Sequence, residues 1–147
     1  MKEIIEQQFD LQDRDAKNMP SLSLAFLGDS VYELVIRTVL ISRITKPHEL
    51  SRMKNRLVNA GAQARVLERL ISAGLLTAEE LAVVKRGRNA HPHTIARHAS
   101  LSDYHMATAL ECLVGWLYKR GEEERLVYLV NEGIREELEK MFIGQHE

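Results

Sequence analysis

Residues 22–41, LSLAFLGDSVYELVIRTVLI, decide the fold, because thirteen of these twenty residues are apolar. A surface helix carries fewer apolar residues, so we predict that this segment forms the central helix, with Pro20 in its first turn. Its polar residues recur about one helical turn apart and form a single narrow stripe, which comprises Asp29, Ser30, Glu33 and Arg37.

The rest of the chain has the hydrophobic period of helices and no alternating strand pattern. Helices are predicted over residues 47–74, 77–88 and 103–118, with a loop over residues 91–102 and a last helix after Gly121. In the last helix the residues predicted to face inward are Leu126, Leu129, Val130, Ile134, Leu138 and Met141. The prediction is one all-α domain over residues 1–147, with residues 1–20 as an N-terminal extension.

Composition excludes several classes of protein. The chain has 147 residues, 45% apolar and 28% charged, which is typical of one globular domain with a real core rather than of a disordered segment. A single cysteine, Cys112, cannot form an internal disulfide, and the start MKEIIEQQFD does not resemble a secretory signal. No apolar run approaches the roughly 20 residues of a membrane span. We therefore expect a cytoplasmic protein that does not enter membranes.

Charge is unevenly distributed along the chain. The net charge of −1 excludes a globally basic protein that wraps nucleic acid. Residues 43–97 nevertheless contain eleven basic and four acidic residues, so this middle part carries +7 and the remainder −8. Either the basic middle presents one positive face to a polyanion, or these charges only solvate the outsides of helices. Charge alone leaves both interpretations open.

Two strongly apolar helices each carry a conspicuous acid, Asp29 and Glu111. A lone carboxylate among apolar neighbours costs several kcal/mol unless it is paired, hydrogen-bonded or metal-bound. Each acid also lies close to a glycine, Gly28 or Gly115, and glycine inside a helix usually marks the close approach of another backbone. The two helices could thus cross closely and bring the carboxylates together, to share a proton or to bind a cation such as Mg²⁺. The alternative is that each acid is a satisfied structural group.

Residues 85–90, KRGRNA, lie at the predicted end of a helix and supply phosphate donors, namely Lys85, Arg86, Arg88 and Asn89. The alternative is that these cations only complement the helix dipole, although this gives no reason for Gly87. The histidines at 91, 93, 98 and 105 are a weak zinc signal and are interpreted as loop residues. Cys112 is expected in the core, and no nucleophile motif is present.

Several of these segments resemble the ribonuclease III family. Residues 24–35, LAFLGDSVYELV, resemble its signature helix, and residues 108–118, TALECLVGWLY, resemble its second acidic helix. Residues 50–59, LSRMKNRLVN, are similar to the basic helix between them. The KRGRNA segment, together with the absence of a double-stranded-RNA-binding domain after residue 147, looks most like the Mini-ribonuclease III subgroup.

This resemblance implies catalytic and metal-binding roles for Asp29 and Glu111, with Mg²⁺ as the cofactor. The family has further acids where this chain has Ala25, Thr108 and Leu22, so the site is expected to hold fewer protein carboxylates. The resemblance also suggests contacts with the RNA backbone, from Lys85, Arg86, Arg88 and Asn89 and, more weakly, from Arg52, Lys54 and Arg56.

The resemblance implies a helical homodimer that cleaves double-stranded RNA with Mg²⁺ and leaves 5′-phosphate and 3′-hydroxyl ends. The implied substrate is precursor 23S ribosomal RNA, with a ribosomal protein as a candidate assistant. Two alternatives remain: a non-catalytic RNA-binding module with the same fold, and a purely structural helical dimer.

Overall fold

The computed structural model describes residues 1–12, 15–90 and 100–143, and every regular element in these ranges is a helix. In chain order the elements are α1 Lys2–Gln8, the short 3₁₀ helix η1 Ala16–Asn18, α2 Ser21–Ile41, α3 Pro47–Val58, α4 Ala60–Ser72, α5 Ala78–Arg88, α6 Leu101–Lys119 and α7 Glu123–Met141. The all-α prediction is confirmed. Among the described residues, no helix has the length and apolar character needed to cross a membrane.

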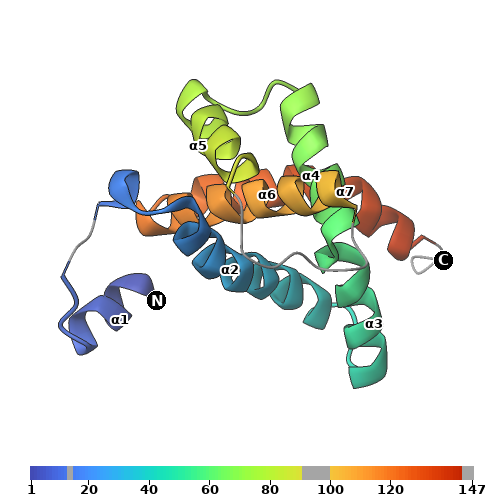
Figure 1. Ribbon diagram of the computed structural model, residues 1–147. Coiled ribbons are helices and arrows are strands. Elements are labelled where there is room, and N and C mark those ends of the chain that lie inside the picture. Colours follow the sequence, from blue (N-terminus) through green and yellow to red (C-terminus); the bar gives the residue numbers. More distant parts are fainter. Residues whose placement is uncertain (13–14, 91–99, 144–147) are drawn as a thin grey trace.

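Helices α2 and α6 form the centre of the molecule. Helix α6 lies against α2, α4 and α5, while α7 packs behind it (Figure 1). The hydroxyl of Ser100 caps α6 by accepting a hydrogen bond from the backbone of Asp103 at 3.0 Å. Because α2 and α6 carry the two acids singled out in the sequence, the core of the fold also determines the position of the candidate site.

The helix predicted over residues 47–74 is in fact two helices, because the chain bends at Asn59. The backbone of Asn59 is extended (φ −66°, ψ 159°), and its side-chain oxygen accepts a hydrogen bond from the backbone of Ala62 at 2.8 Å. Its amide nitrogen donates to the carbonyl of Asn55 at 2.9 Å. One side chain thus ends α3 and caps α4, and Figure 1 shows the two helices meeting at an elbow.

The start of α5 is held to α7 by an ion pair whose carboxylate is buried. Glu80 is 3% exposed and completes the predicted capping box with Thr77. Its carboxylate accepts two hydrogen bonds from Arg125, at 2.7 and 3.0 Å, and Arg125 also donates to the carbonyl of Leu75 at 2.6 Å. The six residues of α7 predicted to face inward are all buried. Helix α7 is therefore held by its apolar face and by charged contacts with Glu80 of α5 and the chain before it.

The N-terminal extension contains structure that the sequence analysis did not predict. Helix α1 buries no residue and lies beside α2 at the edge of the molecule, and η1 follows it (Figure 1). Ile4 and Phe9 are 64% and 72% exposed. Most of the predicted loop over residues 91–102 lies outside the described residues, although α6 begins within it at Leu101.

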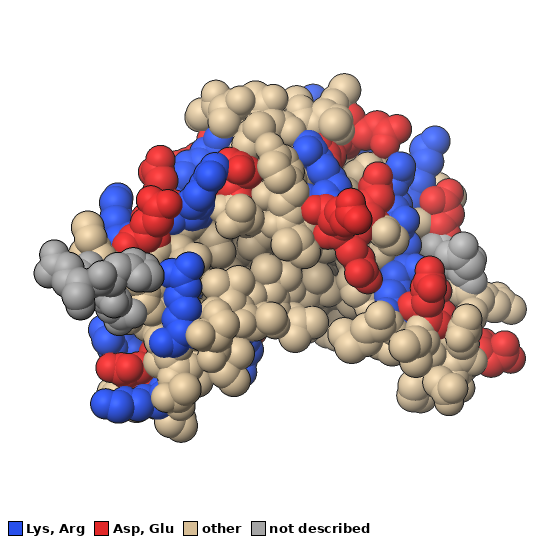
Figure 2. Space-filling model, turned by 180° about the vertical axis from the view of Figure 1, so that it is seen from behind, with Lys and Arg blue, Asp and Glu red and all other residues tan. Residues whose placement is uncertain are grey.

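Figure 2 shows the molecule from the side opposite to Figure 1. The middle of this face is hollowed and carries neither basic nor acidic side chains, whereas charges of both signs alternate on either side. This face therefore offers no continuous positive surface to a polyanion.

Candidate metal centre and nucleic-acid interface

The helices that carry the two acids touch backbone to backbone, as their glycines predicted. A Cβ atom at Gly28 would overlap the carbonyl oxygen of Glu111 and lie 2.8 Å from the nitrogen of Gly115. A Cβ atom at Gly115 would overlap the carbonyl oxygen of Leu24. Neither position can hold a side chain, so α2 and α6 approach as closely as two helices can.

This crossing brings Asp29 and Glu111 together. Burial and, to a smaller extent, the negative charge of Asp29 raise the pKa of Glu111 to about 8, and the interaction with Gln63 opposes this increase. Burial also raises the pKa of Asp29; the charge of Glu33 adds to this increase and Lys54 opposes it. The charge of Asp29 raises the proton affinity of Glu111, so the pair forms a centre that favours a proton or a cation.

Gln63 of α4 is a third member of this centre that the sequence analysis missed. Its side chain is 3% exposed, and within the described residues its amide nitrogen Nε2 has no hydrogen-bond partner. Gln63 lowers the pKa of Glu111, which only the N–H end of an amide can do. Nε2 therefore faces the Glu111 carboxylate, although it does not reach full hydrogen-bond geometry.

The residues present fit a hard divalent cation with few protein ligands. Within the described ranges, no group of three or more His, Cys, Asp and Glu side chains could hold a metal ion. Ala25 and Thr108 are buried, and the Thr108 hydroxyl donates to the carbonyl of Tyr104 at 3.0 Å in its own helix. Mg²⁺ commonly binds through one or two carboxylates and fills its other positions with water and phosphate oxygens. The pair Asp29 and Glu111 matches this pattern.

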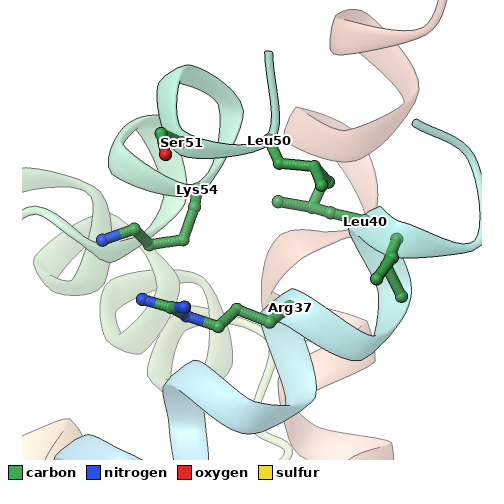
Figure 3. A pocket seen from close by; sticks show the side chains of 6 residues that line it. Arg37, Leu40, Leu50, Ser51 and Lys54 are labelled. Carbon is green, nitrogen blue, oxygen red and sulfur yellow. The ribbon is translucent and has the colours of Figure 1, made fainter. Parts of the chain in front are cut away.

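A small pocket of about 220 Å³, lined by Arg37 and Lys54 among others, lies between α2 and α3, about two helical turns along α2 from Asp29. Figure 3 shows Arg37 and Lys54 extending to one side of it and Leu40 and Leu50 on the other. Both cations bind Glu33, with Arg37 Nη2 at 2.7 Å and Lys54 Nζ at 3.2 Å from Oε1. The ion pair between Lys54 and Glu33 holds α3 against α2. It also places the positive charge of Lys54 near Asp29.

The other two cations predicted on α3 do not join Lys54. Alternate residues of a helix differ by about 200° in direction, so Arg52 and Arg56 project from the face opposite to Lys54. Arg56 lies near α7, with Nη2 at 3.4 Å from Glu137 Oε1. The structure therefore separates the three residues into two surfaces.

The end of α5 presents the predicted phosphate donors at the surface, where Lys85, Arg86, Arg88 and Asn89 are all exposed. Gly87 is buried between them, and a Cβ atom there would lie 2.8 Å from the Sγ atom of Cys112. The glycine is explained by packing of α5 on α6. Arg86 lines a cleft of about 490 Å³ together with Lys17 and Trp116, and Arg88 projects about 200° away.

The remaining candidate residues are Cys112 and the histidines. Cys112 is fully buried, as predicted, and its Sγ atom donates to the carbonyl of Ser21 at 2.9 Å. Burial raises the pKa of its thiol, so Cys112 has no nucleophilic character. His105 was interpreted as a loop residue but lies in α6, whereas the histidines at 91, 93 and 98 lie outside the described residues.

The fold and the paired acids define a helical ribonuclease III domain, and the pattern of the Ribonuclease III domain matches residues 22–122. A protein of Fusobacterium nucleatum known from its crystal structure superposes with a TM-score of 0.75 and 31% identity, covering 84% of this chain and 98% of its own. The Mini-ribonuclease 3 of Enterococcus faecalis is 43% identical over 119 residues, which are 80% of this chain and 90% of that protein. That of Brevibacillus brevis is 46% identical over 120 residues, or 81% and 88%. The chain therefore belongs to the Mini-ribonuclease 3 branch of the ribonuclease III family, whose members are endoribonucleases.

Proposed function

We propose that this protein is a Mg²⁺-dependent, homodimeric endoribonuclease that cleaves double-stranded RNA in the cytoplasm. The observation that carries the proposal is the contact between α2 and α6, which places the carboxylates of Asp29 and Glu111 close enough to repel each other. A fold that needed only stability would gain nothing from this repulsion, whereas a cation bound between the two acids would remove it.

In the proposed reaction Asp29 and Glu111 hold the cation, and Glu111 gives up the proton that it retains in the free protein at neutral pH. When bound, Mg²⁺ activates a water molecule and neutralises the charge that develops on the scissile phosphate. The water oxygen bonds to phosphorus and loses a proton to solvent, while the bond between phosphorus and the 3′ oxygen breaks and the departing 3′ oxygen takes up a proton from solvent. The products are therefore a 5′-phosphate and a 3′-hydroxyl. Lys54 adds positive charge beside Asp29.

We propose that the homodimer forms through the exposed apolar face of α2. Phe26, Leu34 and Ile41 are 84%, 50% and 63% exposed, and their spacing of eight and seven residues keeps them on one side of the helix. In an antiparallel two-fold pairing of α2, Phe26 of a second copy would reach the pocket beside Arg37 and Ile41. Two sites related by such an axis match the antiparallel strands of an RNA duplex.

The proposed RNA contacts come from exposed cations outside the metal centre. Double-stranded RNA is recognised mainly through its backbone and shape, which suits Arg and Lys side chains at helix ends. We assign these contacts to Lys85, Arg86, Arg88 and Asn89, with Arg52, Lys54 and Arg56 as secondary candidates. As the natural duplex we propose the stem of precursor 23S ribosomal RNA, with a ribosomal protein as an assistant, which is what the resemblance to the Mini-ribonuclease III subgroup implies.

The deciding experiment is cleavage of an end-labelled RNA duplex with Mg²⁺, beside EDTA and an Asp29→Asn control. We expect cutting only with the metal, loss of cutting in the variant, and unchanged duplex binding. Gel analysis also reports whether the ends are 5′-phosphates. Duplex binding without cutting, even on a precursor ribosomal RNA stem with its ribosomal protein, would instead identify a non-catalytic RNA-binding module.

A further inference from the structure

Gln63 has properties that the fold alone does not explain. Its side chain is 3% exposed and, in the described part of the chain, its Nε2 atom is buried without a hydrogen-bond partner. Burying an amide donor in this way lowers the stability of the folded state, and an apolar side chain of the same shape would avoid that cost. A buried donor without a hydrogen-bond partner in a native structure indicates that the full hydrogen bond forms only in another state of the protein.

The position of Gln63 identifies that partner. Asn59 caps α4, and its carbonyl accepts a hydrogen bond from the backbone of Gln63 at 3.0 Å, so the bend between α3 and α4 fixes where Gln63 lies. Helix α4 packs on α6, which carries Glu111. The buried Nε2 atom of Gln63 lies against the Glu111 carboxylate, close enough for the two side chains to interact as donor and acceptor.

We propose that Gln63 is a positioning residue, which donates a hydrogen bond from Nε2 to one carboxylate oxygen of Glu111 and leaves the other for a cation shared with Asp29. The assignment rests on the function proposed above and deepens it. A neutral amide suits this role better than Lys or Arg would, because it orients a carboxylate without adding a positive charge that repels the cation. A site with only two carboxylates depends strongly on how each is oriented.

The test uses Gln63→Met, which keeps the length and unbranched shape of the side chain and removes the donor. We expect Mn²⁺ binding to the RNA-free protein, followed by the electron paramagnetic resonance signal of free Mn²⁺, to weaken about 10–100-fold. The Mg²⁺ concentration for half-maximal cleavage should rise by a similar factor, while kcat at saturating Mg²⁺ changes much less. Without metal, the thermal unfolding midpoint of the variant should equal or exceed that of wild type.

Tyr32→Phe is the matched control, because it removes another buried donor of the core, the hydroxyl that binds the carbonyl of Leu57 at 3.1 Å. It should lower the unfolding midpoint and leave both metal measurements unchanged. A folded Gln63→Met protein with wild-type Mn²⁺ binding would overturn the assignment, and so would an unfolded one, since Gln63 would then be structural. Wild-type protein that neither binds Mn²⁺ nor cuts RNA would overturn the proposed function itself, and this assignment with it.

Discussion

Gly28 of α2 and Gly115 of α6 face each other at the point where the two helices cross: a Cβ atom at Gly28 would lie 2.8 Å from the nitrogen of Gly115, and one at Gly115 would lie 3.2 Å from the nitrogen of Gly28. The contact is made by backbone on both sides. Asp29 directly follows the first glycine, and Glu111 lies one turn before the second. The distance between the two carboxylates is therefore set by main chain, which is the least adjustable part of a protein.

Gly28→Ala should destabilise the protein by at least about 3 kcal/mol, because its methyl group meets the backbone of Glu111, which cannot move aside as a side chain can. Urea unfolding measures this change. Gly61→Ala is the matched control, since the nearest atom to its Cβ would be at 3.4 Å on a flexible Arg65 side chain. That variant should change stability by no more than about 1 kcal/mol. Equal effects of the two variants would contradict a backbone contact.

Stability should depend on pH through Glu111. Its pKa is about 8 in the folded protein and near 4.5 when unfolded, so between these values the folded state binds more protons. This contribution therefore makes the metal-free protein less stable as pH rises from about 4.5, until it levels off above about pH 8. Glu111→Gln should remove that loss and be more stable than wild type at pH 8.5, but not at pH 5.

Urea unfolding in EDTA at pH 5, 7 and 8.5 checks this prediction. Glu124→Gln, in the first turn of α7, is the control for removing an exposed carboxylate. The prediction is wrong if the difference in free energy of unfolding between wild type and Glu111→Gln is the same at pH 8.5 as at pH 5. Glu111 would then ionise in the folded protein as readily as in the unfolded one.

Arg125→Met should destabilise the protein by about 3–5 kcal/mol, because it leaves the Glu80 carboxylate buried without its partner. Burial by itself raises the pKa of Glu80, and the hydrogen bonds from Arg125 and Thr77 reverse this and lower it. Arg120→Met is the control, since Arg120 is exposed and its pairs with Glu79 and Glu122 should contribute about 1 kcal/mol or less. Thermal unfolding compares the two, and similar losses would contradict the prediction.

Phe26→Ser should convert the proposed dimer into a monomer, because it removes the most exposed aromatic side chain from the apolar face of α2. Sedimentation velocity over a range of protein concentrations measures the mass. Leu81→Ser on α5, where the leucine is 42% exposed, is expected to remain dimeric. If both variants keep the wild-type mass, a different face forms the dimer.

Arg86 and Arg88 should affect RNA binding differently, because they point in directions about 200° apart. A duplex lying against one side of the α5 end can meet only one of them closely. We expect one of Arg86→Ala and Arg88→Ala to lower the slope of log K against log salt by about one, and the other to leave it nearly unchanged. Filter binding at several salt concentrations identifies which surface faces the RNA; two unchanged slopes would remove this helix end from the interface.

The close crossing of α2 and α6 could be predicted from sequence because its signal is local. A glycine within a long apolar helix usually marks the close approach of another backbone. Gly28 directly precedes Asp29, and Gly115 lies one helical turn after Glu111. The capping box of α5 and the inward face of α7 are local in the same way, and these predictions are confirmed.

The parts that could not be predicted depend on distant partners. Asn59 lies in a sequence whose apolar period continues without interruption, so one long helix was predicted where the structure has α3 and α4. Gln63 is four residues further on, and its role depends on Glu111, 48 positions away. Arg125 and Glu80 are 45 positions apart. Only the cluster of Asn59, Ala60 and Gly61 could have indicated the break.

The backbone contact between α2 and α6 also limits how such a protein can change over generations. Where side chains separate two helices, a series of small replacements can shift a site gradually, each variant remaining usable. At this crossing no side chain separates the helices, so replacing either glycine would change the packing of α2 on α6 and the positions of Asp29 and Glu111 in a single step. If the proposed function holds, new preferences for one RNA over another arise at the periphery, at places such as the exposed end of α5, while the geometry of the proposed catalytic pair is inherited unchanged.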